Sequence, residues 1–273
     1  VEIVEGDTDE IPQGMGTYGS RSAAVGGSSL VMSARKVVDK AREIAAHQLE
    51  ADPDDIEFAS GEFHVAGAPD RAVGIQSVAQ QAYLAHDMPD GMEPGLEATS
   101  FYDPDNFVFP FGTHAAIVEV DPKTGEVEFD TYVAVDDVGN QINPKIVEGQ
   151  IHGGIAQGVG QALYEGAEYD DNGTLLTGSM QDYAVPKAEH IPEMETASTK
   201  TPSPVNPLGV KGVGEAGTIA APQAVVNAVA DALEPFGVDH VDMPMTPERV
   251  WQAVEGGAAA DGGTPQDDDA VDG

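Results

Sequence analysis

A glycine-rich loop in the last third of the chain reads Asn206-Pro207-Leu208-Gly209-Val210-Lys211-Gly212-Val213-Gly214-Glu215-Ala216-Gly217-Thr218 and leads into an apolar helical pattern. Its glycines permit backbone angles closed to other residues and let a ligand approach the main chain. Thr218 can cap the following helix, whose positive end would help to hold an anionic group. Glu215, the only carboxylate of the loop, therefore suits a general base at a buried reaction centre. The alternative is a left-handed turn with a solvated glutamate, and this segment taken alone favours that alternative.

The composition excludes one class of function. Twelve Lys and Arg stand against 48 Asp and Glu in 273 residues, which gives a formal net charge of −36. Binding to nucleic acid needs many basic residues to neutralise phosphates, so it is excluded, and binding to an anionic membrane surface is disfavoured. Because the acidic residues accompany an ordinary apolar content of 41%, the chain is expected to fold, with an acidic surface typical of halophilic proteins.

Cysteine is absent, which excludes thiolate catalysis, zinc–thiolate sites and iron–sulfur clusters ligated by this chain. The seven histidines show no H-x-H or H-E-x-x-H spacing, so no metal held by protein ligands is expected. No apolar run approaches 18 residues and no signal peptide is visible, so the expected location is the cytoplasm. Residues 1–7 alternate like a strand already in progress, without an initiating Met, which predicts a piece of a longer protein.

The first predicted subdomain covers residues 1–106. Apolar residues at helical spacing predict a long helix over 30–49, and a short hairpin is expected from 56–59 and 62–65. Residues 77–86 favour a second helix, and the Pro/Gly/Asp-rich segment 87–106 indicates a loop or junction.

The second predicted subdomain covers residues 107–254, followed by a disordered acidic tail over 255–273. Its expected elements are a hairpin of 115–120 and 126–135, a helix from Pro144 to about residue 165 capped by Asn143, a strand at 196–199, and a last helix to about Leu233 with Pro222 in its first turn. Strands and helices are mixed without a βαβ rhythm, so the predicted class is α+β.

A loop of Gly and hydroxyl residues, Gly16-Thr17-Tyr18-Gly19-Ser20-Arg21-Ser22, precedes the first helix. Amides beside glycines, hydroxyls and an Arg near a helix start form a natural cradle for phosphate. An ordinary Gly/Ser loop explains the same residues equally well.

The helix predicted from Pro144 contains five glycines, and each interior glycine costs about 1 kcal/mol relative to alanine. Something must therefore pack closely against its backbone. Gln150 or Gln157 could offer an amide to a cofactor that the glycines admit. The alternative is close packing between two helices, which is at least as good an explanation.

The spacing Gly212-x-Gly214-x-x-Gly217 also fits a dinucleotide fingerprint, which would make the protein a nicotinamide-dependent dehydrogenase. Three observations weigh against this reading. The lead-in, residues 201–207, holds three prolines and is no central strand. Glu215 would repel a pyrophosphate, and too few residues follow for a doubly wound domain.

Three of these segments occur in a fixed order: residues 16–22, Val147-Glu148-Gly149-Gln150-Ile151-His152-Gly153-Gly154, and Lys211-Gly212-Val213-Gly214-Glu215. In this order, with the strand pattern before them and the Asn143-Pro144 helix start between them, they resemble the molybdenum-binding large subunit of the xanthine dehydrogenase / aldehyde oxidase family. Within that family the chain is most similar to large subunits of the aerobic carbon monoxide dehydrogenase type. The resemblance runs from Val1 to about Val254.

The resemblance implies a molybdenum hydroxylase that transfers oxygen from water to a carbon centre, with Glu215 as the base. It implies molybdopterin cytosine dinucleotide with Mo, held by the pterin dithiolene rather than by protein ligands, as a cysteine-free chain requires. It assigns Gln150 and Gln157 to hydrogen bonds near the metal and the backbone of residues 211–214, including Val213, to the pterin. The phosphates would be held by the loop of Gly16, Thr17, Tyr18, Gly19, Ser20, Arg21 and Ser22, while Gly149 would admit the cofactor to the helix.

The resemblance also implies partners: an upstream half of the large subunit, an iron–sulfur small subunit with 2Fe–2S clusters and a medium subunit with FAD. Large subunits of the family are roughly three times as long as this chain. The resemblance therefore places two features outside the chain: the residues that would select carbon monoxide, an aldehyde or a purine, and any copper-binding cysteine. Alone, the chain is expected to be inactive. The non-enzymatic alternative is a cofactor-free assembly module or remnant.

Overall fold

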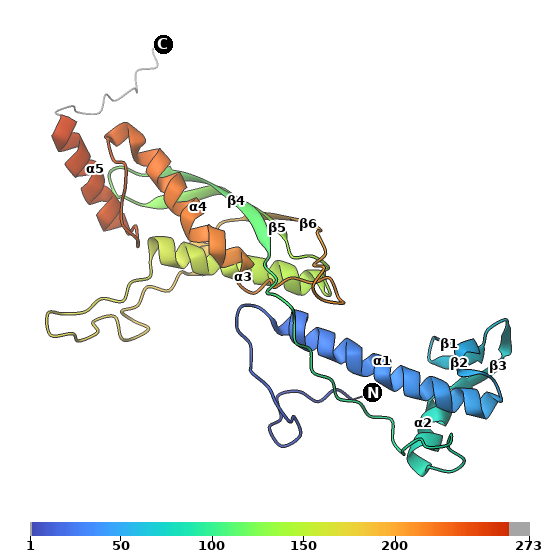
Figure 1. Ribbon diagram of the computed structural model, residues 1–273. Helices are drawn as coiled ribbons and strands as arrows, with labels where there is room; N and C mark the ends of the chain where they lie inside the picture. The colour runs from blue at the N-terminus through green and yellow to red at the C-terminus, as the bar shows by residue number, and fades with distance from the viewer. Residues whose placement is uncertain (1, 262–273) are drawn as a thin grey trace. The chain divides into compact units, whose positions relative to one another are not determined.

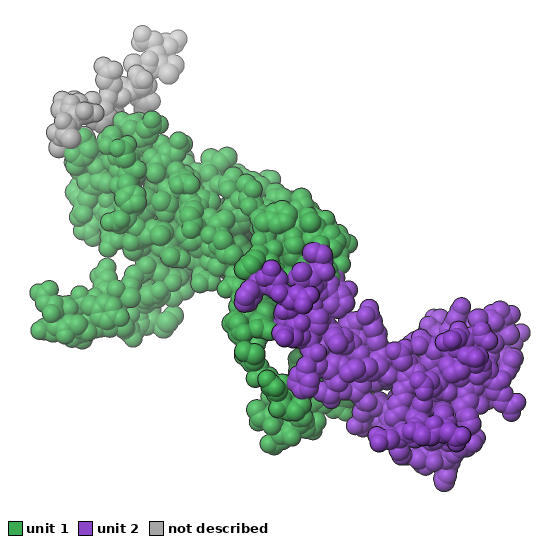
Figure 2. Space-filling model, in the orientation of Figure 1, with its two compact units in different colours: residues 1–21, 108–203, 209–273 green, residues 22–107, 204–208 purple. Residues whose placement is uncertain are grey.

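The computed structural model describes residues 2–261. The chain folds into two compact units, coloured separately in Figure 2. Unit 1 comprises Val1–Arg21, Val108–Ser203 and Gly209–Gly273, and unit 2 comprises Ser22–Phe107 and Pro204–Leu208. The boundary after Phe107 lies beside the predicted one, but residues 1–21 group with unit 1 rather than with the first subdomain. The phosphate-loop candidate up to Arg21 therefore shares a unit with Glu215.

Unit 2 combines one long helix with a small antiparallel sheet of order β1-β2-β3 (Figure 1). Its elements are α1 (Ser22–Leu49), η1 (Pro53–Asp55), β1 (Ile56–Ala59), β2 (Glu62–Val65), β3 (Ala68–Gly74) and α2 (Ile75–Leu84). The predicted hairpin is confirmed. Helix α1 begins eight residues earlier than predicted and includes Gly26 and Gly27. Leu208 packs closely against Gly27, where a Cβ would lie 2.9 Å from Leu208 Cδ1.

The core of unit 2 lies where α1 crosses the sheet and α2. Ala41, Ile44 and Ala45 recur at helical spacing on α1 and are buried together with Phe63 of β2 and Val78 of α2. Full burial of one such large side chain contributes about 1.5–3 kcal/mol.

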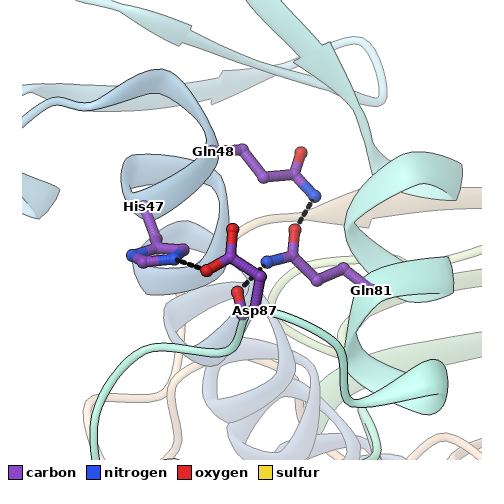
Figure 3. A network of polar contacts seen from close by, with 4 residues as sticks. All are labelled: His47, Gln48, Gln81 and Asp87. Carbon is purple, nitrogen blue, oxygen red and sulfur yellow. Dashed lines mark hydrogen bonds and ion pairs between the residues drawn. The ribbon is translucent and has the colours of Figure 1, made fainter.

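A polar network joins the C-terminal end of α1 to α2 and the turn after it (Figure 3). Gln48 donates to the side-chain oxygen of Gln81, and the Gln81 amide donates to the carbonyl of Asp87. His47 Nε2 lies 3.2 Å from Asp87 Oδ1. An exposed pair of this kind contributes at most about 1 kcal/mol, so the network orients the turn rather than driving folding.

Unit 1 is a mixed sheet covered by helices (Figure 1). Its elements are β4 (Phe111–Val120), β5 (Val127–Asp137), α3 (Pro144–Leu163), η2 (Ala188–His190), β6 (Met194–Thr199), α4 (Ala216–Leu233), η3 (Glu234–Phe236) and α5 (Pro247–Asp261). The sheet order is β4-β5-β6, with β4 antiparallel and β6 parallel to β5. Asn143 caps α3 as predicted, its side chain accepting from the Ile146 amide at 3.4 Å.

The core of unit 1 lies between the sheet and the helices α3 and α4. Alternate residues of β5, Tyr132 and Ala134, point into it and meet Ile155 of α3 and Val225 and Val229 of α4. The class is α+β, as predicted. The described residues contain one parallel strand pair, which gives no basis for a doubly wound dinucleotide domain. None of the helices within residues 2–261 is both long and apolar enough to cross a membrane.

Three sequence-based expectations about elements are wrong. Residues 2–7 form no strand, because they are exposed and no strand pairs with them. Thr218 is not the cap of α4: the helix begins at Ala216 with Glu215 at the N-cap position, so Pro222 falls in the second turn. The Pro222 ring packs over α3, where a Cβ at Gly158 would lie 2.9 Å from its Cδ.

Helix α5 lies partly within the predicted tail. The helix continues to Asp261. Within it, Gly257 packs against the Phe236 carbonyl, because a Cβ on residue 257 would lie only 2.4 Å from that oxygen. The rest of the tail prediction falls on residues 262–273, outside the described residues.

Candidate functional site

The loop before α1 closes in a tight turn. Gly19 and Ser20 both adopt left-handed backbone angles, with φ of 57° and 53°, and the Arg21 amide donates to the Tyr18 carbonyl at 3.3 Å. The Arg21 guanidinium donates to the Tyr18 hydroxyl at 2.5 Å and lies over its ring, 4.9 Å from the centroid. Tyr18 therefore orients the one cation of the loop.

Ser20 connects this loop to the glycine-rich loop of Glu215, 195 residues away. The Ser20 hydroxyl donates to Glu215 Oε2 at 2.8 Å and accepts from the Glu215 amide at 3.1 Å. A Cβ at Gly212 would lie 2.6 Å from Ser20 Cβ, so only glycine permits this approach. Two of the segments singled out from the sequence thus meet at one place.

Glu215 itself lies at the N-terminal end of α4, and its side chain is exposed within this chain. Its carbonyl accepts from the Thr218 and Ile219 amides at 3.2 and 3.1 Å. The positive end of α4 stabilises a negative charge at this position.

A buried ion pair anchors the same loop from the other side. Lys211 Nζ lies 2.9 Å from Asp137 Oδ1 at the end of β5 and 4.3 Å from the centroid of the Phe111 ring, and the Asp137 carboxylate is fully buried. Burial alone would raise the pKa of Asp137. Hydrogen bonds from Lys211, Thr201 and the Gly139 amide outweigh burial and hold that pKa well below its usual range.

Main-chain contacts complete this anchor. The Lys211 amide donates to the Val138 carbonyl and the Asn140 amide to the Gly209 carbonyl, both at 2.9 Å. A Cβ at Gly139 would lie 2.4 Å from that Gly209 oxygen, which explains a glycine with φ of 68° there. The backbone of residues 209–211, at the start of the Glu215 loop, is therefore fixed to the end of the sheet.

Four of the five glycines of α3 divide into two groups, and the fifth, Gly160, packs against Glu165 and Pro186. Gly154 and Gly158 pack against α4: Cβ atoms added there would lie 2.8 Å from Gly217 Cα and 2.4 Å from Ala221 Cβ. Because residue numbers rise together along both helices at this contact, α3 and α4 run in the same general direction. Their N-terminal ends, one carrying Glu215, therefore lie on the same side of unit 1. For these glycines the helix-packing explanation is correct.

The other group leaves the α3 backbone open. Cβ atoms added at Gly149 and Gly153 would meet nothing within 4 Å among the described residues. Gln150 and Gln157 are exposed, and their spacing of two helical turns places them on one face. Gln150 Oε1 lies 3.7 Å from where a Cβ on Gly214 would stand. This face can admit a ligand to the main chain beside the Glu215 loop.

Sequence reasoning missed a buried polar cluster on the sheet. His114 Nδ1 lies 2.9 Å from the Tyr132 hydroxyl and Nε2 lies 3.3 Å from Asp136 Oδ2, with both the His114 and Asp136 side chains almost wholly buried. Burial, reinforced by the Asp136 charge, raises the pKa of Tyr132. The available signal was the pair of acids, Asp136-Asp137, directly after the apolar residues 132–135 of β5. No cluster of three His, Asp or Glu able to hold a metal is found in residues 2–261.

The contacts of Ser20 with Glu215 and of Gln150 with Gly214 bring three of the predicted site segments together in unit 1. A family model described as a molybdopterin cofactor-binding domain matches residues 1–192. The chain belongs to the molybdopterin cofactor-binding domain family. The resemblance inferred from the sequence is therefore confirmed at the level of the family.

Individual proteins similar to this chain support the same family assignment. The chain is 43% identical to the carbon monoxide dehydrogenase large chain of Hydrogenophaga pseudoflava, over 93% of this chain and 32% of that protein. It is 42% identical to the nicotine 6-hydroxylase large subunit of Paenarthrobacter nicotinovorans, over 94% and 32%. Among solved structures, reconstituted CO dehydrogenase from Oligotropha carboxidovorans superposes with a TM-score of 0.87 at 39% identity, over 94% of this chain and 32% of that one. The chain thus spans about a third of the length of these relatives.

The residues present fit the cofactor of this family. The turn of residues 16–21 presents an oriented guanidinium on Arg21, beside the left-handed backbone of Gly19 and Ser20, which an anion can approach. The open backbone at Gly149 and Gly153 leaves room that a Cβ would reduce. Ser22 is the first residue of α1, in unit 2.

Proposed function

We propose that this chain is the second cofactor-binding part of a molybdenum hydroxylase large subunit, active within a larger assembly. The observation that carries the proposal is the contact between Ser20 and Glu215, because it joins the candidate phosphate loop to the candidate base. Gln150, beside Gly214, adds the third segment of the family pattern to the same end of the unit.

The proposed cofactor is molybdopterin cytosine dinucleotide. Thr17, Arg21 and the amides of residues 16–21 would hold its phosphates, and Ser22 stays a predicted ligand. The backbone of residues 211–214 would support the pterin, since the Asp137–Lys211 anchor fixes its position. Gln150 and Gln157 would donate amide hydrogens from the open face of α3. When bound, the cofactor supplies the two-electron redox chemistry and the oxygen-donating centre.

Glu215 is the residue that would move a proton. Its carboxylate would accept the proton of the attacking hydroxyl, as a general base held at fixed geometry requires. Glu215 lies at the N-cap of α4, where the helix carries a partial positive charge. Among the described residues Oε1 has no hydrogen-bond partner, whereas Oε2 accepts from Ser20, so Oε1 is the atom that would take the proton.

We also propose that the chain works with partners in a larger complex. The remaining two-thirds of a large subunit, an iron–sulfur small subunit with 2Fe–2S clusters and an FAD medium subunit would complete the electron path. The substrate would be a small molecule with an electrophilic carbon: carbon monoxide, an aldehyde or a purine.

The acidic surface is proposed as an adaptation to high salt, in which screening reduces repulsion among like charges.

Elemental analysis for molybdenum, with nucleotide release, tests this proposal on the native complex purified through this chain in high salt. We expect about one molybdenum per chain and released CMP. An intact complex with neither metal nor nucleotide would instead identify the chain as a non-catalytic assembly module.

A further inference from the structure

The Ser20 hydroxyl forms two hydrogen bonds with one residue, Glu215. It donates to Glu215 Oε2 at 2.8 Å and accepts from the Glu215 amide at 3.1 Å. A hydroxyl has one proton to donate and lone pairs to accept with, so the two bonds are compatible. Together they hold the side chain and the main chain of Glu215 in one geometry.

Close packing fixes Ser20 in this position. Cβ atoms at Gly212 and Gly214 would lie 2.6 Å from Ser20 Cβ and 3.1 Å from Ser20 Oγ, so Ser20 fits against the bare backbone of the loop. Ser20 also adopts φ of 53°, an angle uncommon for a residue other than glycine. Both observations show that Ser20 is held in one position against the Glu215 loop.

Ser20 also contacts the main chain at the N-terminus of α4. Glu215 occupies the N-cap position, and its own side chain makes no capping hydrogen bond. The first amides of a helix have no partners within the helix itself. Here the hydroxyl oxygen of Ser20, from a loop 195 residues away, accepts from the amide of the N-cap residue, Glu215. The start of α4 is thereby tied to the turn of residues 16–21.

We propose that Ser20 is a positioning residue for Glu215 rather than a ligand of the cofactor phosphates. An ionised phosphate only accepts hydrogen bonds, and the single proton of Ser20 is already donated to the carboxylate. Phosphate binding then falls to Thr17, Arg21 and the amides of the turn. This inference rests on the proposed function, because it takes Glu215 as the base.

Ser20→Gly in the assembled complex removes the hydroxyl and suits the left-handed backbone, so it is the least disruptive deletion. We expect kcat per molybdenum to fall about ten- to hundredfold, the size of effect that loss of alignment produces. The KM should change little, and molybdenum and CMP content should stay near wild type. The assay is oxidation of carbon monoxide, an aldehyde or a purine, whichever the wild-type complex oxidises.

A second readout is independent of turnover. The Glu215 amide should exchange its hydrogen faster in Ser20→Gly, measured by mass spectrometry of peptides covering residues 212–218. Ser20→Ala, which keeps Cβ, should give the same result and so exclude a backbone effect. Ser29→Ala is the matched control: its hydroxyl donates to the Gly26 carbonyl on α1, and the substitution should change neither rate nor exchange.

Two results would overturn the role of Ser20. One is loss of molybdenum and CMP in proportion to activity, which would make Ser20 a phosphate ligand. The other is wild-type rate and exchange in Ser20→Gly. Glu215→Gln, assayed in parallel, separates the two levels of inference. If Glu215→Gln is inactive while Ser20→Gly has the wild-type rate and exchange, only the role of Ser20 is contradicted. If Glu215→Gln is active, the proposed function itself is contradicted.

Discussion

Lys211 and Asp137 form a buried ion pair, 2.9 Å apart, at the base of the loop that carries Glu215. Removing one partner of such a pair leaves the other charge buried and uncompensated, at a cost of about 3–5 kcal/mol. We therefore expect Asp137→Asn to lower the thermal midpoint of the complex strongly. Asp39→Asn breaks the exposed pair with Arg42 and, as a control, should change stability by less than about 1 kcal/mol.

The same substitution has a predicted pH dependence. Since the folded-state pKa of Asp137 lies below its unfolded value, the carboxylate contributes stability above about pH 4 and loses it as pH falls further. The difference in stability between wild type and Asp137→Asn should be constant above about pH 4 and shrink below it. A difference that instead grew on acidification would contradict this account of the pair.

The neighbouring glycines of α3 provide a matched comparison. Gly154→Ala should destabilise the protein by about 1–3 kcal/mol, because its Cβ would meet the backbone of Gly217 at 2.8 Å. Gly153→Ala has open space and should match or slightly exceed wild-type stability, yet lower cofactor retention. Thermal unfolding and molybdenum content measure the two effects. Equal retention in Gly153→Ala and wild type would argue that no ligand lies on this face.

Arg21 is expected to affect binding of the cofactor rather than the rate of turnover. Arg21→Ala should lower molybdenum and CMP content several-fold, because it removes the oriented cation of the phosphate loop. Arg21→Lys keeps the charge but loses the fork geometry and should retain an intermediate amount. Full cofactor content in Arg21→Ala would place the phosphates elsewhere.

The net charge of −36 leads to a prediction about salt. Screening should reduce repulsion between carboxylates, so the thermal midpoint should rise as sodium chloride is raised from about 0.1 M to above 1 M. A midpoint that falls over this range would remove the halophilic explanation of the composition.

Regular elements could be predicted where their pattern is periodic. The α1 helix, both hairpins and α3 have apolar spacing or caps that can be read from the sequence. Strand β3 was missed because Pro69, Asp70 and Arg71 obscure any alternation on this edge strand. Helix α5 was missed because Gly256 and Gly257 interrupt its pattern, and only the contact with Phe236 explains the second of them.

The candidate site could be predicted as residue types but not as contacts. Glu215, Arg21 and Gln150 were identified because a carboxylate, a cation and an amide are unusual among glycines. The bond between Ser20 and Glu215 could not be predicted, since a contact between two irregular loops leaves no periodic signal in the sequence. The burial of Asp137 likewise depends on the pairing of β5 with β6.

Glu215→Gln tests the central claim most directly, because glutamine keeps the size of the side chain and removes its ability to act as a base. Turnover and molybdenum content should be measured on the same preparation of the assembled complex. We expect turnover to be abolished while molybdenum and CMP stay near wild-type levels. Loss of cofactor in step with activity would show that Glu215 is structural, and retained turnover would show that it is not the base.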